Sequence, residues 1–461
     1  MAEPSKHSFS ELFIWMASRG QFWNIIMRGL SAASSFFVLA ALSVYQFGLY
    51  QLILAAVAIA GSFASGFFDD IISNEIARAL AEGKPGWAKR LFLQFFASKA
   101  LLAFLAAGIL FLGADLVARY YDRDMAGFIR IASALALLGP LRAAESLFFS
   151  ATRSFAAFGA GAIQEVVRLL ALAAFWVWGA LGLGEVLVAS VIAALTVLGY
   201  TSFFFFREYR RRFWAIPAEP GKPLWGLIRG YGLWLSLRFG ITRSLKGTDV
   251  WIVRLFLNTE AVAFYALVIN LISFVQSMAP TAILGTLLPW EVKDRQRLQH
   301  IYRRMMKYGF FFGIALAVGA FFAVPFAIEL FFPKYLTAMP LFRLMLIAMP
   351  FFVVYKFQKI FLIVLREQKI LALRRMGEEL LTLGVLALFL PIVGLFAVVV
   401  SFLVVYASRV ALLTLYLSRH YPELRLKLRH IFSFDRDDLK VGQQILREVV
   451  RPRRWLGSIQ P

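Results

Sequence analysis

The side chains of this protein that could do chemistry are basic residues embedded in long apolar segments. Thirteen of its 49 lysines and arginines lie inside such segments. A charge in hydrocarbon is costly, and it usually faces the interior of a helix bundle or a water-filled cavity. Cations placed there bind anions, and arginine adds bidentate contacts to phosphate or carboxylate groups. The candidates for an anion-binding cavity are Arg28, Arg142, Arg243, Lys246, Arg254, Lys356 and Lys359.

Arg28 and Arg243 are the principal pair of candidates because they occupy equivalent positions. Each lies 14 residues before a predicted outer turn, which is about 21 Å along a helix. In a hydrocarbon core about 30 Å thick, both are expected at the same depth, in the inner half. On a helix, Arg243, Lys246 and Arg254 share an arc of about 80°. The sequence therefore predicts several cations facing one cavity at one depth.

Other in-span charges have two alternative roles, in anion binding or in structural ion pairs. Arg142 and Lys356 are also expected in the inner half, with Lys359 one helical turn beyond Lys356. Ion pairs form readily at a helical spacing of three residues, and the chain offers Arg142–Glu145, Lys246–Asp249 and Glu165–Arg168. Lys99, near the start of its segment, is expected to extend toward the membrane interface.

Twelve apolar windows of helical length are the elements that must position these residues. Of 461 residues, 60% are hydrophobic and 16% are charged, which excludes a soluble globular enzyme and a disordered chain. A spanning helix needs about 20 mainly apolar residues, and helices satisfy their own backbone hydrogen bonds in lipid. The sequence thus predicts an all-α polytopic membrane protein with about 12 transmembrane helices. The windows lie near 22–44, 47–72, 91–114, 125–151, 160–181, 184–206, 226–257, 261–288, 308–331, 338–365, 376–394 and 394–417.

The basic residues outside the spans predict the orientation in the membrane. Of the 49 cations, 33 fall in segments on the side of the N-terminus and only 3 in the loops on the other side. Cytoplasmic loops carry such an excess of lysine and arginine, so both termini are expected in the cytoplasm. Most of the formal charge of +22 therefore reflects topology, and no nucleic-acid partner is expected.

The chain divides near its midpoint into two halves that share a weak repeat. LSVYQFGLYQL at 42–52 aligns with LNTEAVAFYAL at 257–267, and the same offset superimposes Arg28 on Arg243. Both halves begin on the inner side, which predicts two parallel six-helix repeats. The expected division is a cytoplasmic N-terminus 1–21, a bundle 22–206, a cytoplasmic linker 207–225, a second bundle 226–417 and a basic cytoplasmic tail 418–461.

Three segments carry a resemblance to a known family. LSVYQFGLYQL with the following DDIISNEIARALAEGK resembles the start of bacterial polysaccharide flippases of the Wzx type, the O-antigen transporters. FFPKYLTAMPLFRLMLIA at 331–348 resembles the outer turn before their tenth span. These transporters belong to the multidrug/oligosaccharidyl-lipid/polysaccharide exporter superfamily, together with the multidrug and toxin extrusion (MATE) exporters and the lipid II flippases. The phenylalanine-rich stretch SFFFFREYRRR at 202–212 has no counterpart in the family pattern.

The resemblance implies a fold, a location and a function. The fold would be two six-helix bundles forming a V in the bacterial cytoplasmic membrane. The implied function is to flip a polyprenyl-pyrophosphate-linked oligosaccharide to the outer leaflet by alternating access, for lipopolysaccharide or another surface polysaccharide. The cation set named above would then bind the pyrophosphate. Membrane lipids and the polysaccharide polymerase machinery are the other expected partners, and the protein is not expected to be an enzyme.

Coupling to an ion is a further expectation. Asp69 and Asp70 are expected to end the second span, where they would bind Na⁺ or a proton or lie at the headgroups. Glu145 and Asp249 lie deeper and are also candidates. The chain has no cysteine and only four histidines, all in polar flanks or tails. No metal site and no cofactor beyond a coupling H⁺ or Na⁺ is therefore expected.

Two other functions compete with the flippase. A drug or cation exporter of the same superfamily would present acidic residues to its cavity, whereas the in-span charge here is mainly basic. A membrane-embedded glycosyltransferase or polymer ligase could use the Asp122-Arg123-Asp124 sequence. The loops on that side are too short to build an acceptor site.

Overall fold

The described part of the chain is helical throughout and contains no strand. A computed structural model describes residues 26–64, 69–121, 124–152, 159–230, 245, 247–279, 295–365, 367–426 and 431–433. Asp122, Arg123, Arg243 and Lys246 lie outside these residues, as does the side chain of Asp70.

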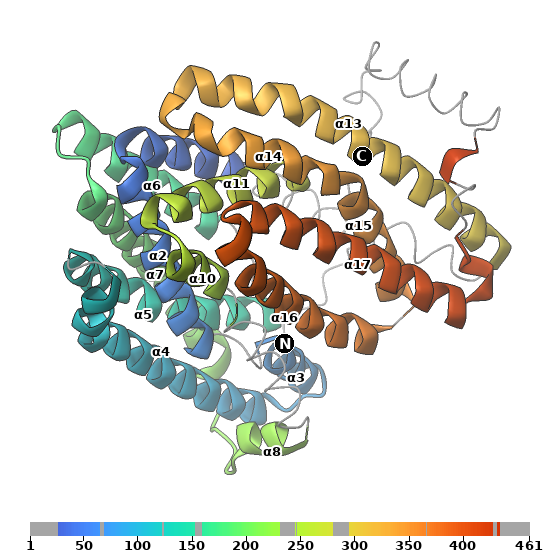
Figure 1. Cartoon of the computed structure of the whole chain (residues 1–461). Coiled ribbons are helices and arrows are strands. Elements are labelled where there is room, and N and C mark those ends of the chain that lie inside the picture. Colours follow the sequence, from blue (N-terminus) through green and yellow to red (C-terminus); the bar gives the residue numbers. More distant parts are fainter. Residues whose placement is uncertain are drawn as a thin grey trace, which may run out of the picture. The chain divides into compact units, whose positions relative to one another are not determined.

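The helices of the first half follow one another with short connections (Figure 1). After a helix at Ile26–Ala41 come α2 (Val44–Ala64), α3 (Asp69–Ala81), α4 (Pro85–Tyr121), α5 (Met125–Ala151), α6 (Ala160–Val177), α7 (Leu183–Phe213) and α8 (Pro223–Gly230). The second half contains α10 (Thr248–Phe256), α11 (Thr259–Ser277), α13 (Arg295–Phe331), α14 (Met339–Met345), α15 (Met349–Val364), α16 (Gln368–Val393) and α17 (Phe396–His420). Short 3₁₀ turns at Pro333–Ala338 and Leu346–Ala348 flank α14.

Long apolar helices confirm the predicted class, an all-α polytopic membrane protein. Among the described residues, nine helical segments are long and apolar enough to cross a membrane, and Ile26–Ala41 is a shorter apolar helix. The helix α5 begins and ends at the boundaries predicted for its window. The predicted window 376–394 lies within α16 except for its last residue, and the middle of 226–257, residues 231–244, lies outside the described residues.

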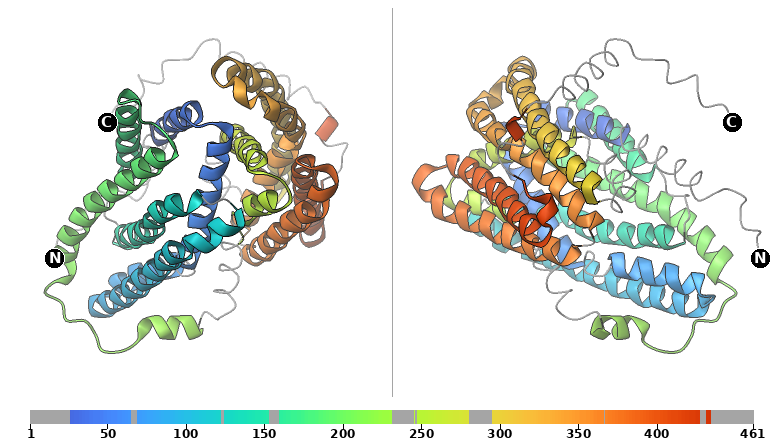
Figure 2. Two further views of the ribbon diagram at one scale, coloured as in Figure 1. Left: turned by 60° about the vertical axis from the view of Figure 1, so that its left-hand side comes forward. Right: turned by 90° about the vertical axis from the view of Figure 1, so that its right-hand side faces the viewer.

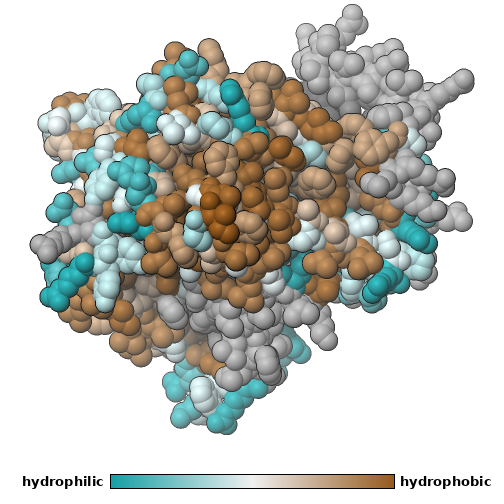
Figure 3. Space-filling view, viewed as in Figure 1, coloured by the Kyte–Doolittle hydropathy of each residue, from teal (hydrophilic) through white to brown (hydrophobic). Residues whose placement is uncertain are grey.

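The exposed surface is itself largely apolar, as a protein dissolved in lipid requires. Along α4, Leu101, Phe104, Ile109 and Leu112 are all exposed. Figure 3 shows hydrophobic side chains covering most of the visible face. In water such a surface would be a large unpartnered patch, whereas hydrocarbon solvates it without cost.

The expected position of Asp69 and Asp70 at the end of the second span stays a prediction. The described part of α2 ends at Ala64 and that of α3 begins at Asp69, and residues 65–68 lie outside the described residues.

The helices form two compact units that do not follow the order of the chain. Unit 1 contains residues 1–273, 322–344 and 372–402, and unit 2 contains 274–321, 345–371 and 403–461. The division into two six-helix bundles stays a prediction. In unit 1, α4 packs against α5, which packs against α7, and α6 also packs on α7 (Figure 2).

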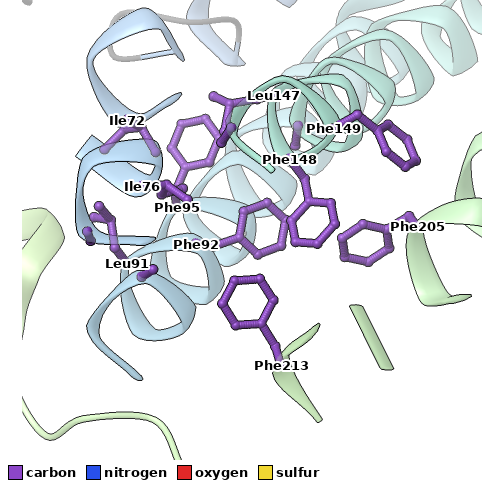
Figure 4. Packing of buried hydrophobic residues seen from close by; sticks show 14 residues of the cluster. Ile72, Ile76, Leu91, Phe92, Phe95, Leu147, Phe148, Phe149, Phe205 and Phe213 are labelled. Carbon is purple, nitrogen blue, oxygen red and sulfur yellow. The ribbon is translucent and has the colours of Figure 1, made fainter. Parts of the chain in front are cut away.

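A cluster of phenylalanine rings joins α4, α5 and α7 in unit 1 (Figure 4). The ring centroid of Phe148 lies 5.0 Å from that of Phe92, 4.9 Å from Phe205 and 5.9 Å from Phe213. Tilted and edge-on contacts of this kind are the favourable geometry for aromatic pairs. Phe205 belongs to the phenylalanine-rich stretch, so one role of that stretch is to pack this cluster.

Unit 1 also holds together the predicted outer ends of helices from both halves of the chain. The Lys334 ammonium, after α13, donates hydrogen bonds to the carbonyl oxygens of Ala40 (3.1 Å) and Leu42 (2.5 Å). A Cβ on Gly48 of α2 would overlap the carbonyl of Thr259, at the start of α11. Only glycine permits that approach. We call these contacts the outer seal.

Unit 2 is built on the close approach of α13 to α15. A Cβ on Gly313 would lie 2.6 Å from the Cα of Pro350, and one on Gly309 would lie 2.6 Å from the Phe357 ring. The Glu367 carboxylate, after α15, accepts hydrogen bonds from the hydroxyls of Tyr421 (2.7 Å) and Tyr416 (2.8 Å). These bonds lower the pKa of Glu367, and the contact raises the pKa of Tyr421 to about 12. The end of α15 is thereby tied to the end of α17.

The phenylalanine cluster predicts different effects of truncating a buried ring on α5 and an exposed ring on α7. Phe148→Ala would leave a cavity among rings that are fully buried. Such truncations cost about 3–5 kcal/mol in soluble cores, and less in a membrane, where helices gain no hydrophobic transfer energy by packing. We expect a clearly lower melting temperature in detergent. Phe206→Ala, at a position 60% exposed, should leave it unchanged, and equal effects would contradict the cluster's role.

Candidate functional site

A group of three cations lies among aromatic rings in unit 2. The Lys356 ammonium of α15 lies 5.2 Å from the centroid of the Phe352 ring. Lys359 and Arg409 both interact with it electrostatically. The guanidinium of Arg409, on α17, lies 4.4 Å from the Tyr406 ring and 5.3 Å from the Tyr355 ring. We call these three cations the cation cluster.

The rings that support the cation cluster are fixed by packing and hydrogen bonds. Tyr355 and Tyr406 are buried, and the Gln276 amide donates to the Tyr406 hydroxyl at 3.3 Å. One turn along α15, the Gln358 amide donates to the Thr414 hydroxyl at 2.8 Å. Ring faces attract cations, but they do not neutralise charge. Like charges in a medium of low dielectric raise one another's energy, and Lys356 lies beside two of them.

A second polar group joins α5, α6 and α7 in unit 1. Arg142 donates a hydrogen bond to the Gln164 side chain. The buried Glu145 carboxylate accepts hydrogen bonds from the hydroxyls of Thr201 and Ser202 on α7. The expected Arg142–Glu145 ion pair is therefore wrong, because each side chain turns to a neighbouring helix. Hydroxyl donors solvate a carboxylate in the absence of water.

The predicted pair Glu165–Arg168 is confirmed. Their charged atoms lie 3.9 Å apart on α6, and Arg168 also donates to the Tyr50 hydroxyl of α2 at 2.9 Å. One oxygen of Glu165 and the Nε of Arg168 are buried without a hydrogen-bond partner. The pair therefore has hydrogen-bonding capacity that the surrounding protein does not use.

Lys99 and Asp69 form a buried ion pair between α4 and α3. The Lys99 ammonium lies 2.8 and 2.7 Å from the two oxygens of Asp69 and 5.1 Å from the centroid of the Phe95 ring. Lys99 is only 3% exposed. The expectation that it extends to the membrane interface is wrong, because a carboxylate is available inside the fold. Asp69, an ion-coupling candidate, is occupied by this lysine.

Two further candidates on α10 lie in structural contacts. The Arg254 guanidinium donates to the carbonyl oxygens of Tyr121 (3.0 Å) and Leu257 (3.3 Å). It thereby joins the end of α10 to the end of α4, where the rings of Tyr121 and Trp251 also meet. Asp249 accepts a hydrogen bond from the buried Tyr265 hydroxyl of α11. Their roles in substrate binding and ion coupling stay predictions.

The principal predicted pair cannot be compared in the structure. Arg28 is exposed in the described helical segment Ile26–Ala41, beside Met27, whose sulfur would lie 2.8 Å from a Cβ on Gly161. Its proposed counterpart Arg243 lies outside the described residues, as do Lys246 and the side chain of Asp70. The shared depth of Arg28 and Arg243 stays a prediction.

A family profile matches the chain over more than half of its length. The profile is described as polysaccharide biosynthesis protein, and it covers residues 19–293. The chain belongs to this family. The predicted resemblance to polysaccharide flippases is thereby confirmed at the level of the family. No curated protein sequence matches the chain significantly.

Several solved structures share the fold. An inward-facing multidrug resistance MATE family transporter of the MOP superfamily is 12% identical, with a TM-score of 0.65 over 85% of this chain and 94% of that one. The lipid II flippase MurJ, in an inward closed conformation, is 12% identical, with a TM-score of 0.66 over 94% and 96%. A MOP superfamily transporter from Pyrococcus furiosus is 14% identical, with a TM-score of 0.55 over 88% and 95%. These similarities show that the chain shares the fold of these proteins.

Sequence reasoning missed Arg409 as a member of the cation cluster. The repeat directed attention to charges that recur in both halves, and Arg409 was not among the recurring positions. A usable signal was present. Arg409 is the one basic residue between the charged start of α16 and the last turn of α17, three positions after a tyrosine. A lone cation inside such a long apolar stretch needs a partner or a function.

The Asp69–Lys99 pair predicts strong coupling between two substitutions. Asp69→Asn or Lys99→Met alone leaves one buried charge without its partner, which typically costs about 3–5 kcal/mol. The double variant removes both charges and should recover most of the lost thermal stability in detergent.

Ion coupling by Asp69 can be separated from this structural role. If Asp69 carries the coupling ion, the stable double variant should lose ion-dependent transport. Ion-dependent transport in the double variant would remove Asp69 from the coupling candidates.

Proposed function

We propose that the protein flips a polyprenyl-pyrophosphate-linked oligosaccharide from the inner to the outer leaflet of the bacterial cytoplasmic membrane by alternating access. Membership of the polysaccharide biosynthesis family and the MOP-type fold support a transporter of this general kind. The observation that carries the more specific proposal is the cation cluster of Lys356, Lys359 and Arg409.

The chemistry of the substrate explains the cluster. A pyrophosphate headgroup carries several negative charges on closely spaced oxygens, and moving it through hydrocarbon requires a compensating set of cations. Arginine offers a planar fork for two oxygens, and lysine offers a compact charge. The aromatic rings beside Lys356 and Arg409 attract these cations without cancelling their charge.

Coupling to an ion would use a buried carboxylate. Glu145 is the best supported candidate, because its carboxylate is buried and solvated by two hydroxyls rather than by a lysine. The other charged groups on its side of α5 and α6 are Arg142, Glu165 and Arg168. Asp249, held by Tyr265, is the second candidate. Measuring transport first with an H⁺ gradient and then with a Na⁺ gradient identifies the coupling ion.

A multidrug-type exporter of cations is the competing function, since one structural neighbour is a multidrug resistance transporter. The buried Glu145 and the half-buried Glu165 favour this alternative, whereas the cation cluster disfavours it by repulsion. We retain the flippase because three cations share one site. Whether the flippase serves lipopolysaccharide or another surface polysaccharide depends on the sugar that its substrate carries. The alternative of a glycosyltransferase or polymer ligase rests only on the sequence Asp122-Arg123-Asp124.

The cation cluster is tested by reconstituted flipping. Lys356→Gln and Arg409→Gln each remove charge-assisted hydrogen bonds worth about 1.5–3 kcal/mol, so each should reduce flipping of a labelled polyprenyl-pyrophosphate oligosaccharide in liposomes by about tenfold or more. The readout is access of the sugar to a glycosidase outside the vesicle.

The matched control is Arg130→Gln, which removes an exposed arginine paired with Asp115 at 2.6 Å and should retain flipping. Wild-type flipping by both cluster variants would refute the assignment. Uptake of a cationic dye that those variants do not impair would favour the exporter.

Alternating access predicts that the outer seal must open. The chain has no cysteine, so paired cysteines can be introduced directly. We expect Ala40→Cys with Lys334→Cys, joined by a reducible thiol cross-linker, to stop flipping, and reductant to restore it. The control pair Asp115→Cys with Arg130→Cys joins helices within the first half and should not stop flipping. Full activity of the cross-linked Ala40–Lys334 protein would show that the seal does not open.

A further inference from the structure

The segment that connects the two halves is firmly attached to the start of α4. The Lys89 ammonium donates to the carbonyl oxygens of Phe213 (2.9 Å) and Ile216 (2.7 Å). Gln94 donates to the carbonyl of Gly221 at 2.9 Å and accepts from the backbone amide of Leu224 at 3.2 Å. Side chains of α4 thus satisfy four backbone polar groups of this connection.

The exposed side chains of this connecting segment include arginine, lysine and tryptophan. Trp214 is 68% exposed and Trp225 is 52% exposed. The guanidinium of Arg210 lies 5.7 Å from the Trp214 ring, and that of Arg229 lies 5.3 Å from the Trp225 ring. Residues 207–230 contain six basic and two acidic residues. We call the exposed residues Arg210, Arg211, Trp214, Lys222, Trp225 and Arg229 the basic–aromatic surface.

The helix α8 has one face on the protein and one face away from it. Leu224 and Leu227 pack against the phenylalanine cluster, while Trp225 and Arg229, one turn apart, are exposed. The helix lies beside the start of α4 in Figure 1, and Figure 3 shows a hydrophilic surface in the same place. A short amphipathic helix with this composition is typical of a membrane interface.

The end of α7 sets the depth of this surface. Phe203 and Phe206 are exposed and apolar, and the exposed Arg207, Arg210 and Arg211 follow within about one to two turns. At 31 residues, α7 is about 46 Å long, which exceeds a hydrocarbon core of about 30 Å. The change from exposed phenylalanine to exposed arginine therefore marks the boundary between hydrocarbon and lipid headgroups.

We propose that the basic–aromatic surface binds anionic phospholipid headgroups of the leaflet on that side, with Trp214 and Trp225 seated at the interface. Tryptophan is enriched at that level of the membrane, and clustered basic residues bind anionic lipid there. The opposite charges and the immediate continuity with the lipid-exposed part of α7 identify the occupant as a lipid rather than a soluble protein or nucleic acid. The inference does not depend on the proposed transport function.

The test compares two lipids added to the full-length protein in detergent. Phosphatidylglycerol should raise the melting temperature, and phosphatidylcholine with the same acyl chains should not. The variant R210Q/R211Q/K222Q/R229Q should keep the melting temperature of the lipid-free protein and lose the shift. Each basic residue near an anionic surface changes affinity by about fivefold, so half-maximal stabilisation should need at least tenfold more phosphatidylglycerol.

The control variant is R119Q/R130Q. Its substitutions lie in the last turn of α4 and near the start of α5, and it should keep the full shift. An unchanged shift in the fourfold variant would overturn the proposal. Equal stabilisation by inorganic pyrophosphate or by RNA that is lost in the fourfold variant would also overturn it, because the surface would then bind phosphate groups without regard to lipid.

A second readout tests the tryptophans. In liposomes of brominated lipid, replacing Trp214 and Trp225 with Phe should reduce the fraction of tryptophan fluorescence that bromine quenches. If both rings face water, the same replacement should raise that fraction, and the proposed membrane contact would be wrong.

Discussion

The free energy of placing a charge in hydrocarbon is the constraint on which the structure depends. Three charges in the described spans are stabilised in three different ways. Lys99 is neutralised by Asp69, Glu145 is solvated by two hydroxyls, and Arg254 donates to backbone carbonyls. These contacts join neighbouring helices, and their chemistry differs from that of the cation cluster. There, Lys356 is held against a ring and beside other cations, which leaves its charge to act on something else.

The aromatic residues have three roles, and the surroundings of each ring determine which role it has. Where helices meet, as at Phe148, rings pack on rings. Where a helix faces lipid, as at Phe206, the rings are exposed on the helix surface. At the ends of helices, as at Trp214, they stand beside arginine. One phenylalanine-rich stretch of α7 therefore serves the core, the lipid surface and the interface within a few turns.

The sequence was sufficient for the class of fold and for most spans, because apolar length alone specifies a membrane helix. The window 125–151 matches α5 residue for residue. Side-chain pairing was harder, because partners lie on other helices. Arg142 and Glu145 are neighbours on one helix face, yet each bonds across to α6 or α7. The exception is Glu165–Arg168, whose partners share a helix. Arg409 joins Lys356 only through the packing of α17 on α15, and no local pattern encodes that.

The most direct test of the central claim is the affinity of the purified protein for polyprenyl pyrophosphate compared with polyprenyl monophosphate. The lipid tail is the same in both, so the difference isolates the extra phosphate. If the cation cluster binds the headgroup, the pyrophosphate should bind at least about tenfold more tightly, and K356Q/R409Q should abolish that preference while leaving monophosphate affinity nearly unchanged. Equal affinities in the wild-type protein, or a preference that survives in the double variant, would contradict the account.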